Sequence, residues 1–415
     1  MNMHVNIGSD VVANGRSYRR PEQPVVVICL DGSEPGYIEA AIGAGLAPNL
    51  DRLMKTGANA TALSVIPSFT NPNNLSIITG RPPAVHGIAG NFFYDREAGV
   101  EVMMNDAKFL RAPTILAEFQ KAGLKVAMVT AKDKLRTLLG KGLDFSSGTA
   151  IAFSSEKADK ANLADNGIEN VLDFVGLALP EVYSADLSEF VFAAGVKLLK
   201  TFQPDVMYLS TTDYVQHKAA PGSEVANSFY AMFDRYVGEL DALSTLVITA
   251  DHGMNDKHLP DGSPDVIYLQ EILDKALGAG TTRVILPITD PYVAHHGALG
   301  SFATVYVDGL KKASVIEIAR SLDGITVAIP AEEACERFEL PADRIGDVVV
   351  LCDRHKVIGT SAAKHDLSGL TEPLRSHGGL TEQTVPMISN RAIEVQAGRT
   401  LRNFDVFDVA LNLVR

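Results

Sequence analysis

Four continuous apolar runs divide the first 250 residues and predict buried strands. They are VVVICL at 25–30, KVAMVT at 125–130, VMYLS at 206–210 and LVITA at 246–250. Runs of this kind are typical of strands covered on both faces. Segments with helical patterns lie between them, at 47–57, 113–123 and 223–243. Because strands alternate with helices, we predict an α/β fold with a mostly parallel sheet flanked by helices.

The stretch from 261 to 367 has its own pattern of short strands around a helix near 315–322. The strand candidates are RVILPIT, FATVYV, ITVAIP and DVVVLCD. We interpret this stretch as a smaller α/β cap domain, inserted into a catalytic core formed by 22–260 and 368–415. Residues 1–22 have little core-forming content, and we expect a loose tail there.

Composition narrows the classes of partner. The chain has 415 residues and a net charge of −13, so it lacks the basic surplus that nucleic-acid binding needs. No apolar run reaches 18 residues, which argues against a membrane span. The three cysteines are far apart and the first 24 residues contain no signal-peptide pattern, so we expect a cytoplasmic protein. The sequence leaves the choice between a monomer and a homodimer open.

Polar residues follow each of the predicted strands. They are Asp31, Lys132, Asp213, Asp251 and His252. Ligands of open α/β sheets bind outside the carboxyl ends of the strands, so these side chains should meet at one edge. A lone aspartate after a strand is often only a turn or helix cap. Their joint occurrence favours a shared site.

The same residues belong to a set with metal-binding chemistry. His217 lies four residues after Asp213, which places both on one face if the segment is helical. His377, in RSHGG, adds a third imidazole. Mixed carboxylate and imidazole ligands suit zinc, although manganese or iron would also fit. A single histidine is more often a satisfied core or surface residue, so the hypothesis depends on the whole set.

Three further motifs could act on an anion. Thr70, in PSFTNPNN, should lie near a helix N-terminus, where it either faces a phosphate-like group or merely caps the helix. Asn91, in HGIAGN, either donates to an oxyanion or stabilises a turn. Lys132 and Lys134 would face the same way in an extended segment and could clamp a second anionic group, or they form a solvated loop.

As an ordered set, these motifs resemble the alkaline phosphatase superfamily, and within it the nucleotide pyrophosphatase/phosphodiesterase branch. The resemblance extends from Asp31 to His377. It implies two Zn²⁺ ions, one held by Asp213, His217 and His377 and the other by Asp31, Asp251 and His252. It further implies that Thr70 is the nucleophile and that Asn91 binds a phosphonyl oxygen.

The segments TDYVQHKAAPG, AKDKLR and SHGGLTEQTVPM resemble the members that hydrolyse phosphonoacetate. That resemblance implies cleavage of a C–P bond to acetate and phosphate through a phosphothreonine, with Lys132 and Lys134 on the substrate carboxylate.

Three other functions stay open. They are a nucleotide pyrophosphatase/phosphodiesterase that uses the aromatic run at 92–94, a phosphomutase-like relative, and a non-catalytic metal-dependent phosphonate-binding protein. His295 and His296, in VAHHGALG, either touch substrate or an adventitious metal or form a turn, and the turn is favoured. His258 is interpreted as a loop residue, and none of the three enters the ligand set.

Overall fold

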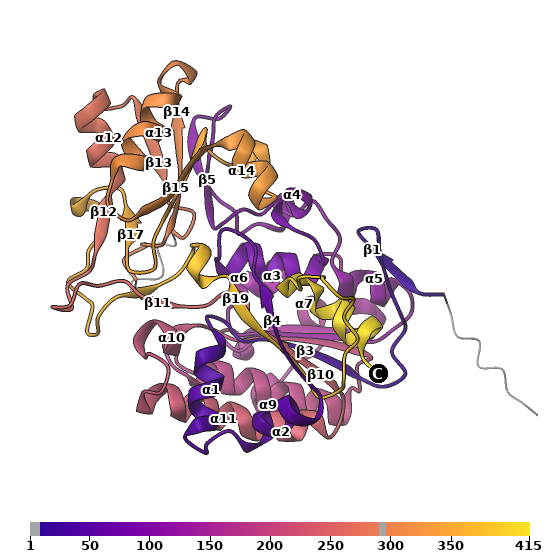
Figure 1. Cartoon of the computed structure of the whole chain (residues 1–415). Coiled ribbons are helices and arrows are strands. Elements are labelled where there is room, and N and C mark those ends of the chain that lie inside the picture. The colour runs from indigo at the N-terminus through magenta and orange to yellow at the C-terminus, as the bar shows by residue number, and fades with distance from the viewer. Residues whose placement is uncertain (1–8, 290–295) are drawn as a thin grey trace, which may run out of the picture.

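A seven-stranded sheet forms the centre of the larger part of the molecule (Figure 1). The computed structural model describes residues 9–289 and 296–415. The strands of this sheet, in spatial order, are β4 (Ala58–Leu63), β19 (Thr384–Ser389), β10 (Thr245–Thr249), β3 (Val25–Cys29), β9 (Val206–Ser210), β7 (Val126–Thr130) and β8 (Ala150–Ser154). The five strands from β10 to β8 are parallel, whereas β19 and β4 are antiparallel to their neighbours. The mostly parallel α/β fold is thus confirmed.

Helices cover both faces of this sheet, because alternate residues of each strand point to opposite sides. In β3, Val26 and Ile28 belong to one apolar cluster, while Val25 and Val27 belong to the other. The first cluster includes α1 (Pro35–Gly43), α2 (Pro48–Thr56), α8 (Val171–Val175), α9 (Asp186–Thr201) and α11 (Glu224–Asp241). The second includes α3 (Thr70–Thr79), α5 (Ile115–Lys121), α6 (Asp133–Leu139) and α15 (Val406–Asp408).

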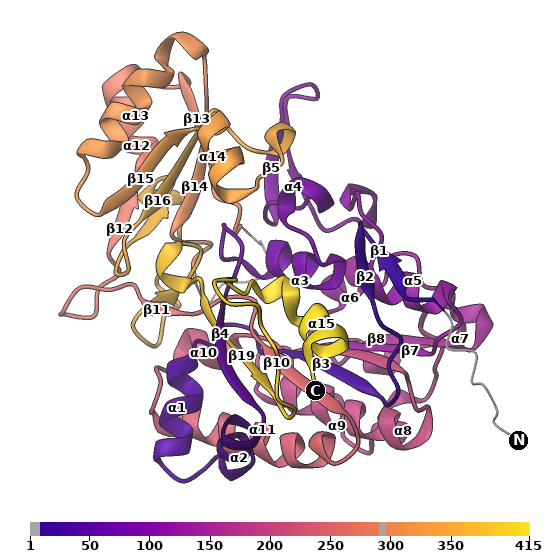
Figure 2. The same cartoon turned by 45° about the vertical axis from the view of Figure 1, so that its right-hand side comes forward.

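A smaller antiparallel sheet stands apart from the first one (Figure 2). Its strands, in spatial order, are β13 (Thr282–Ile285), β14 (Phe302–Val307), β16 (Val348–Cys352) and β15 (Ile325–Pro330). The helices in this part are α12 (Leu269–Leu277), α13 (Lys312–Ser321) and α14 (Ala331–Phe338). We refer to residues 261–367 as the cap, and its bounds as a domain stay a prediction.

Short elements complete the fold. The strands are β5 (Phe92–Asp95), β6 (Val100–Met103), β11 (Asn255–Asp256), β12 (Val266–Tyr268), β17 (Val357–Gly359) and β18 (Arg375–Ser376). The helices are α4 (Pro83–His86), α7 (Leu163–Asn166) and α10 (Tyr214–Lys218). Among the described residues, no helix combines the length and apolar character needed to cross a membrane.

The N-terminal segment differs from the expected loose tail. Residues 11–18 form a hairpin of β1 (Val11–Ala13) and β2 (Arg16–Tyr18), and Tyr18 is fully buried. Asn14 and Gly15 both have positive φ, at 51° and 73°. An Asn-Gly pair of this kind is a strong hairpin signal, so the prediction was wrong because it overlooked the turn.

Candidate active site

Four neighbouring strands of the large sheet end at the predicted site. In spatial order, β10 leads to Asp251 and His252, β3 to Asp31, β9 to Asp213 and β7 to Lys132. These strands are parallel, so their carboxyl ends share one edge. The fold therefore brings together residues that are up to 221 positions apart in the chain, from Asp31 to His252.

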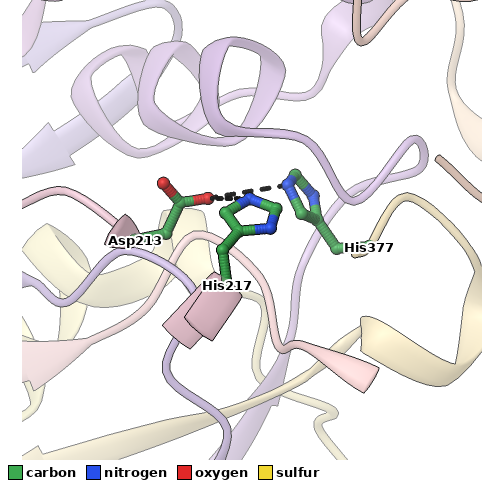
Figure 3. A group of neighbouring side chains, drawn as sticks. All are labelled: Asp213, His217 and His377. Carbon is green, nitrogen blue, oxygen red and sulfur yellow. Dashed lines mark ion pairs between the residues drawn. The ribbon is translucent and has the colours of Figure 1, made fainter. Parts of the chain in front are cut away.

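One group of possible metal ligands consists of Asp213, His217 and His377 (Figure 3). Asp213 directly precedes α10, and this short helix places His217 on the same face. The Asp213 Oδ2 atom is 2.9 Å from Nε2 of His217 and 3.7 Å from Nε2 of His377. The ligand atoms of the three residues all lie within 4.8 Å of one another.

A second group consists of Asp31, Asp213 and His252, whose ligand atoms also lie within 4.8 Å of one another. Nε2 of His252 is 3.3 Å from Asp31 Oδ1. Asp251 lies beside this group, with its Oδ2 at 3.8 Å from the same nitrogen. Asp251 is fully buried and accepts hydrogen bonds from the Gly32 N–H and the Asn74 amide. The structure thus brings all six predicted ligands into one place.

All three histidines are oriented by a backbone carbonyl. Nδ1 of His217 lies 2.8 Å from the Arg375 oxygen, and Nδ1 of His377 lies 2.7 Å from the Ser68 oxygen. Nδ1 of His252 lies 2.9 Å from the Gly253 oxygen. A carbonyl only accepts, so each Nδ1 carries the proton and each Nε2 presents a lone pair to the site. This arrangement is usual for histidines that bind metals.

The electrostatics of the site also favour a cation. Burial and the nearby carboxylates of Asp213 and Asp251 raise the pKa of Asp31 well above its ordinary value. Within residues 9–289 and 296–415, Asp31 Oδ1 is buried and accepts no hydrogen bond. A divalent ion would neutralise the repulsion and satisfy this oxygen. The donor set therefore fits metal binding.

A cavity of about 660 Å³ lies over these ligands. It is lined by Asp31, Thr70, Asn91, Asp213, His217 and His377 among others, while Asp251 and His252 lie beneath it. Thr70 is the first residue of α3, and its Oγ1 is 3.3 Å from Nε2 of His252. Thr70 does not cap helix α3, which was the other possibility, because Phe69 occupies the N-cap position.

Lys132 and Lys134 both line the cavity, but they do not lie in the extended segment that the sequence analysis predicted. The segment is not extended, because α6 begins at Asp133 and Lys134 lies in its first turn. The Asp133 N–H donates to Glu156 at 2.8 Å, and this contact stabilises the helix start. Lys132 donates to the Val182 carbonyl at 3.0 Å and lies 5.4 Å from the Tyr183 ring centre.

A family model of type I phosphodiesterases/nucleotide pyrophosphatases matches residues 25–380. The chain belongs to this family. The family is metal-dependent, and the two ligand groups described above are consistent with that property.

Two solved structures are similar to this chain over nearly its whole length. They are crystal structures of phosphonoacetate hydrolase from Sinorhizobium meliloti 1021, in complex with phosphonoformate and with phosphonoacetate. Each is 61% identical to this chain, covers 97% of it and 98% of the other chain, and has a TM-score of 0.94.

More distant members support the fold alone. Murine ectonucleotide pyrophosphatase/phosphodiesterase 5 is 20% identical over 94% of this chain and 96% of its own, with a TM-score of 0.63. A venom phosphodiesterase from Macrovipera lebetinus is 26% identical over 56% of this chain. The matched region spans only 26% of the venom protein's length.

The cavity is also lined by residues that the sequence analysis left outside the site, among them His296, Tyr183 and Tyr214. His296 lines the cavity and stacks on His217 with 5.1 Å between ring centres. It lies in a turn, as the sequence analysis favoured, and its position beside the candidate ligands keeps the alternative of a contact with substrate or metal. Tyr183 and Tyr214 also line the cavity and lie 6.3 Å apart. Tyr214 directly follows Asp213, which is the one signal that could have found it. His295 lies outside the described residues, and His258 contacts the Leu259 carbonyl away from the ligands.

The aromatic run at 92–94 does not form a slot for a nucleotide base. Its residues form β5 and do not line the cavity among the described residues. Phe93 packs on Phe109, and Tyr94 packs on Tyr306 of the cap.

Proposed function

We propose that the protein hydrolyses the carbon–phosphorus bond of phosphonoacetate to acetate and phosphate. One observation carries the proposal. A single cavity is lined by the candidate nucleophile Thr70, by Lys132 and Lys134, and by four of the six candidate metal ligands, Asp31, Asp213, His217 and His377. A dianionic phosphonyl group and a carboxylate match this distribution of positive charge. A hydrolase that is 61% identical has phosphonoacetate bound in its crystal structure.

The family is metal-dependent, and we propose two Zn²⁺ ions as the cofactors. Asp213, His217 and His377 would hold one ion, and Asp31, Asp251 and His252 the other. The carboxylate and imidazole donors support zinc. When bound, the ions would act as Lewis acids on the phosphonyl group and lower the pKa of the attacking hydroxyl.

The chain's own residues would carry out the displacement. The Thr70 hydroxyl loses its proton to water, and its Oγ forms a bond to phosphorus as the C–P bond breaks, so that the electron pair stays on the acetate carbon. That charge delocalises into the carboxylate, where Lys132 and Lys134 stabilise it as it grows. The Asn91 amide donates to a phosphonyl oxygen. The carbanion takes a proton from water, and a second water molecule hydrolyses the phosphothreonine to release phosphate.

Phosphate release from phosphonoacetate tests this function. We expect metal-loaded protein to release phosphate, and Lys132→Ala/Lys134→Ala to lose most of that activity with its metal content unchanged. Lys364→Ala, a cap lysine that does not line this cavity, is the control. No release by the unaltered protein, together with cleavage of a nitrophenyl phosphodiester, would move the function to the nucleotide branch. Tyr183 and Tyr214 would then be the candidates for contact with the base.

We also propose a cytoplasmic location, since Cys29, Cys335 and Cys352 are all unpaired thiols. A homodimer stays a prediction that light scattering of the purified protein would test.

A further inference from the structure

A buried ion pair lies beside the candidate metal ligands but outside the cavity. Nζ of Lys257 is 3.0 Å from Oε1 of Glu382, and neither side chain has any exposed surface. Lys257 directly follows β11, and Glu382 ends the short helical turn Leu380–Glu382. The proposed reaction uses neither residue.

Glu382 joins the two loops that provide histidine ligands. Its Oε2 accepts the Gly379 N–H at 2.8 Å, two residues after His377. Its carbonyl oxygen accepts the Gly253 N–H at 2.7 Å, one residue after His252. Its Oε1 also accepts the side chain of Asn255. One residue thus makes hydrogen bonds to both ligand loops, 251–255 and 376–379.

The same network reaches the candidate nucleophile. Ser68, two residues before Thr70, donates from Oγ to the Gly379 carbonyl at 2.9 Å. The Ser68 carbonyl accepts Nδ1–H of His377 at 2.7 Å. A displacement of Gly379 would therefore move His377 and the segment that leads to Thr70 together.

Lys257 connects this network to the segment before His377, through Leu374, and to the cap, through Asp353. Its backbone N–H donates to the Leu374 carbonyl at 2.8 Å, and its Nζ lies 3.4 Å from the Asp353 carbonyl just after β16. Strands β11 and β18 pair antiparallel with Asn255 opposite Ser376, which fixes the register of the two ligand loops.

Burial of an ion pair of this kind in the core has a high free-energy cost. Two charges lose most of their hydration on burial, and well-packed apolar side chains often stabilise a protein as well or better. Burial alone would raise the pKa of Glu382, but Lys257 and the surrounding hydrogen bonds outweigh it and hold this pKa below the ordinary value. The carboxylate is therefore ionised at neutral pH and holds the hydrogen bonds from both loops.

We propose that Glu382, with Lys257 as its buried counter-ion, is a positioning residue that sets the spacing between the two metal-binding loops. The proposal rests on the metal-dependent function proposed above for this site. On this proposal, the ion pair affects how tightly and with what geometry the two ions bind, and it does not contact the substrate.

The test uses three variants of the full chain: Glu382→Gln, Lys257→Met, and the double variant. Each is measured for the melting temperature without metal, the zinc affinity by titration against a chelator, and the absorption spectrum of the cobalt-loaded protein. Turnover is measured as kcat and KM. Lys356→Met is the control, because it breaks a half-buried ion pair with Asp265 in the cap, away from the candidate ligands.

We expect Glu382→Gln to weaken binding of at least one ion and to lower kcat roughly tenfold or more, the usual effect of changing a group that orients metal ligands. KM should change little, and the cobalt spectrum should shift. The double variant removes the unpaired charge, so its melting temperature should recover while zinc affinity and spectrum stay altered. Lys356→Met should bind zinc like the unaltered protein.

Recovery of zinc affinity, spectrum and kcat in the double variant would show a purely structural pair and overturn the inference. So would an unaltered zinc affinity and spectrum in Glu382→Gln, if that variant folds. These metal-binding measurements decide the inference even if phosphonoacetate proves not to be the substrate, because they need no turnover.

Discussion

At the scale of single residues, the three candidate histidine ligands share one constraint. Each donates Nδ1–H to a backbone carbonyl, so the Nε2 lone pair is aimed before any ion arrives. The aspartates are more crowded, because burial and mutual repulsion raise the pKa of both Asp31 and Asp251. Imidazoles held in one orientation and carboxylates that repel one another form a donor set that suits divalent cations.

The first residue-scale prediction concerns Thr70. Thr70→Ala should lower kcat by roughly three orders of magnitude or more, as expected when a nucleophile is removed. Zinc content and phosphonoacetate binding, measured by calorimetry, should be retained because the ligands are untouched. Thr70→Ser keeps a hydroxyl and should keep measurable activity. Near-normal turnover by Thr70→Ala would disprove the nucleophile assignment.

The second concerns His86, a buried residue outside the metal site. Its Nδ1 accepts the Ile88 N–H at 3.2 Å, so Nε2 carries the proton and donates to Ser76 Oγ at 2.9 Å. Burial, with a smaller contribution from Arg344, lowers its pKa to about 3. The folded protein therefore keeps His86 neutral at pH values where the unfolded chain binds a proton.

The consequence is a stability that is present above the unfolded pKa of about 6.5 and is lost as the pH falls. Between pH 7 and pH 5, this residue should cost about 2 kcal/mol of unfolding free energy. His86→Gln should be less stable at pH 7, but its urea midpoint should fall less between the two pH values. An equal fall in both proteins would contradict the assignment.

At the scale of elements, the hairpin of β5 and β6 connects Asn91 to the cap. The Asn91 N–H donates to the Pro287 carbonyl at 2.6 Å, and Tyr94 and Tyr306 pack with ring centres 5.2 Å apart. Arg283 of β13 forms an ion pair with Glu101 of β6 at 2.7 Å. The cap thus contributes to the position of Asn91, whose amide is a candidate donor to the substrate and belongs to the core.

Gly90→Ala should disturb this contact. A Cβ atom at Gly90 would lie 2.4 Å from Pro287 Cβ and 3.0 Å from its carbonyl, so one of the two segments must move. A shift of about 1 Å in a catalytic group can cost up to roughly a hundredfold in rate. We expect a clear loss of kcat with normal zinc content. Gly309→Ala has open space around the new methyl group and should behave like the unaltered protein.

The elements that the sequence predicted well are those with strong period or length. Strands β3, β7, β9 and β10 are buried along their whole length, and such strands read as continuous apolar runs. Strand β4 was missed because it lies at the edge of the sheet, where all of its residues except Ala62 are half-buried or exposed. Its sequence, ANATAL, gives a weak apolar signal.

The candidate site was predictable where chemistry follows a strand end, as at Asp31, Asp213 and Asp251. It was not predictable where tertiary contacts decide the position. Glu156 fixes the start of α6 across 23 residues, so the sequence near Lys134 gave no sign that this segment is helical. His296 and Tyr183 reach the cavity from loops whose course depends on packing elsewhere.

At the scale of the whole molecule, removal of metal should lower stability. Ions that bind only the folded state stabilise it by about 2.7 kcal/mol at a hundred times their dissociation constant. Repulsion among Asp31, Asp213 and Asp251 would add to the loss. We expect a chelator to lower the melting temperature by several degrees, and added zinc to restore it. The same melting temperature in both states would argue against metal ions at this site.

The order of the ligands along the chain has a consequence for biosynthesis. Asp31 follows the third strand, β3, and His377 comes 346 residues later, just before β19 enters the large sheet between β10 and β4. During synthesis, all three candidate aspartate ligands therefore leave the ribosome well before His377 does. Full metal loading must then be a late event, and a chain truncated before His377 would lack a complete ligand set even if the parallel strands had already assembled.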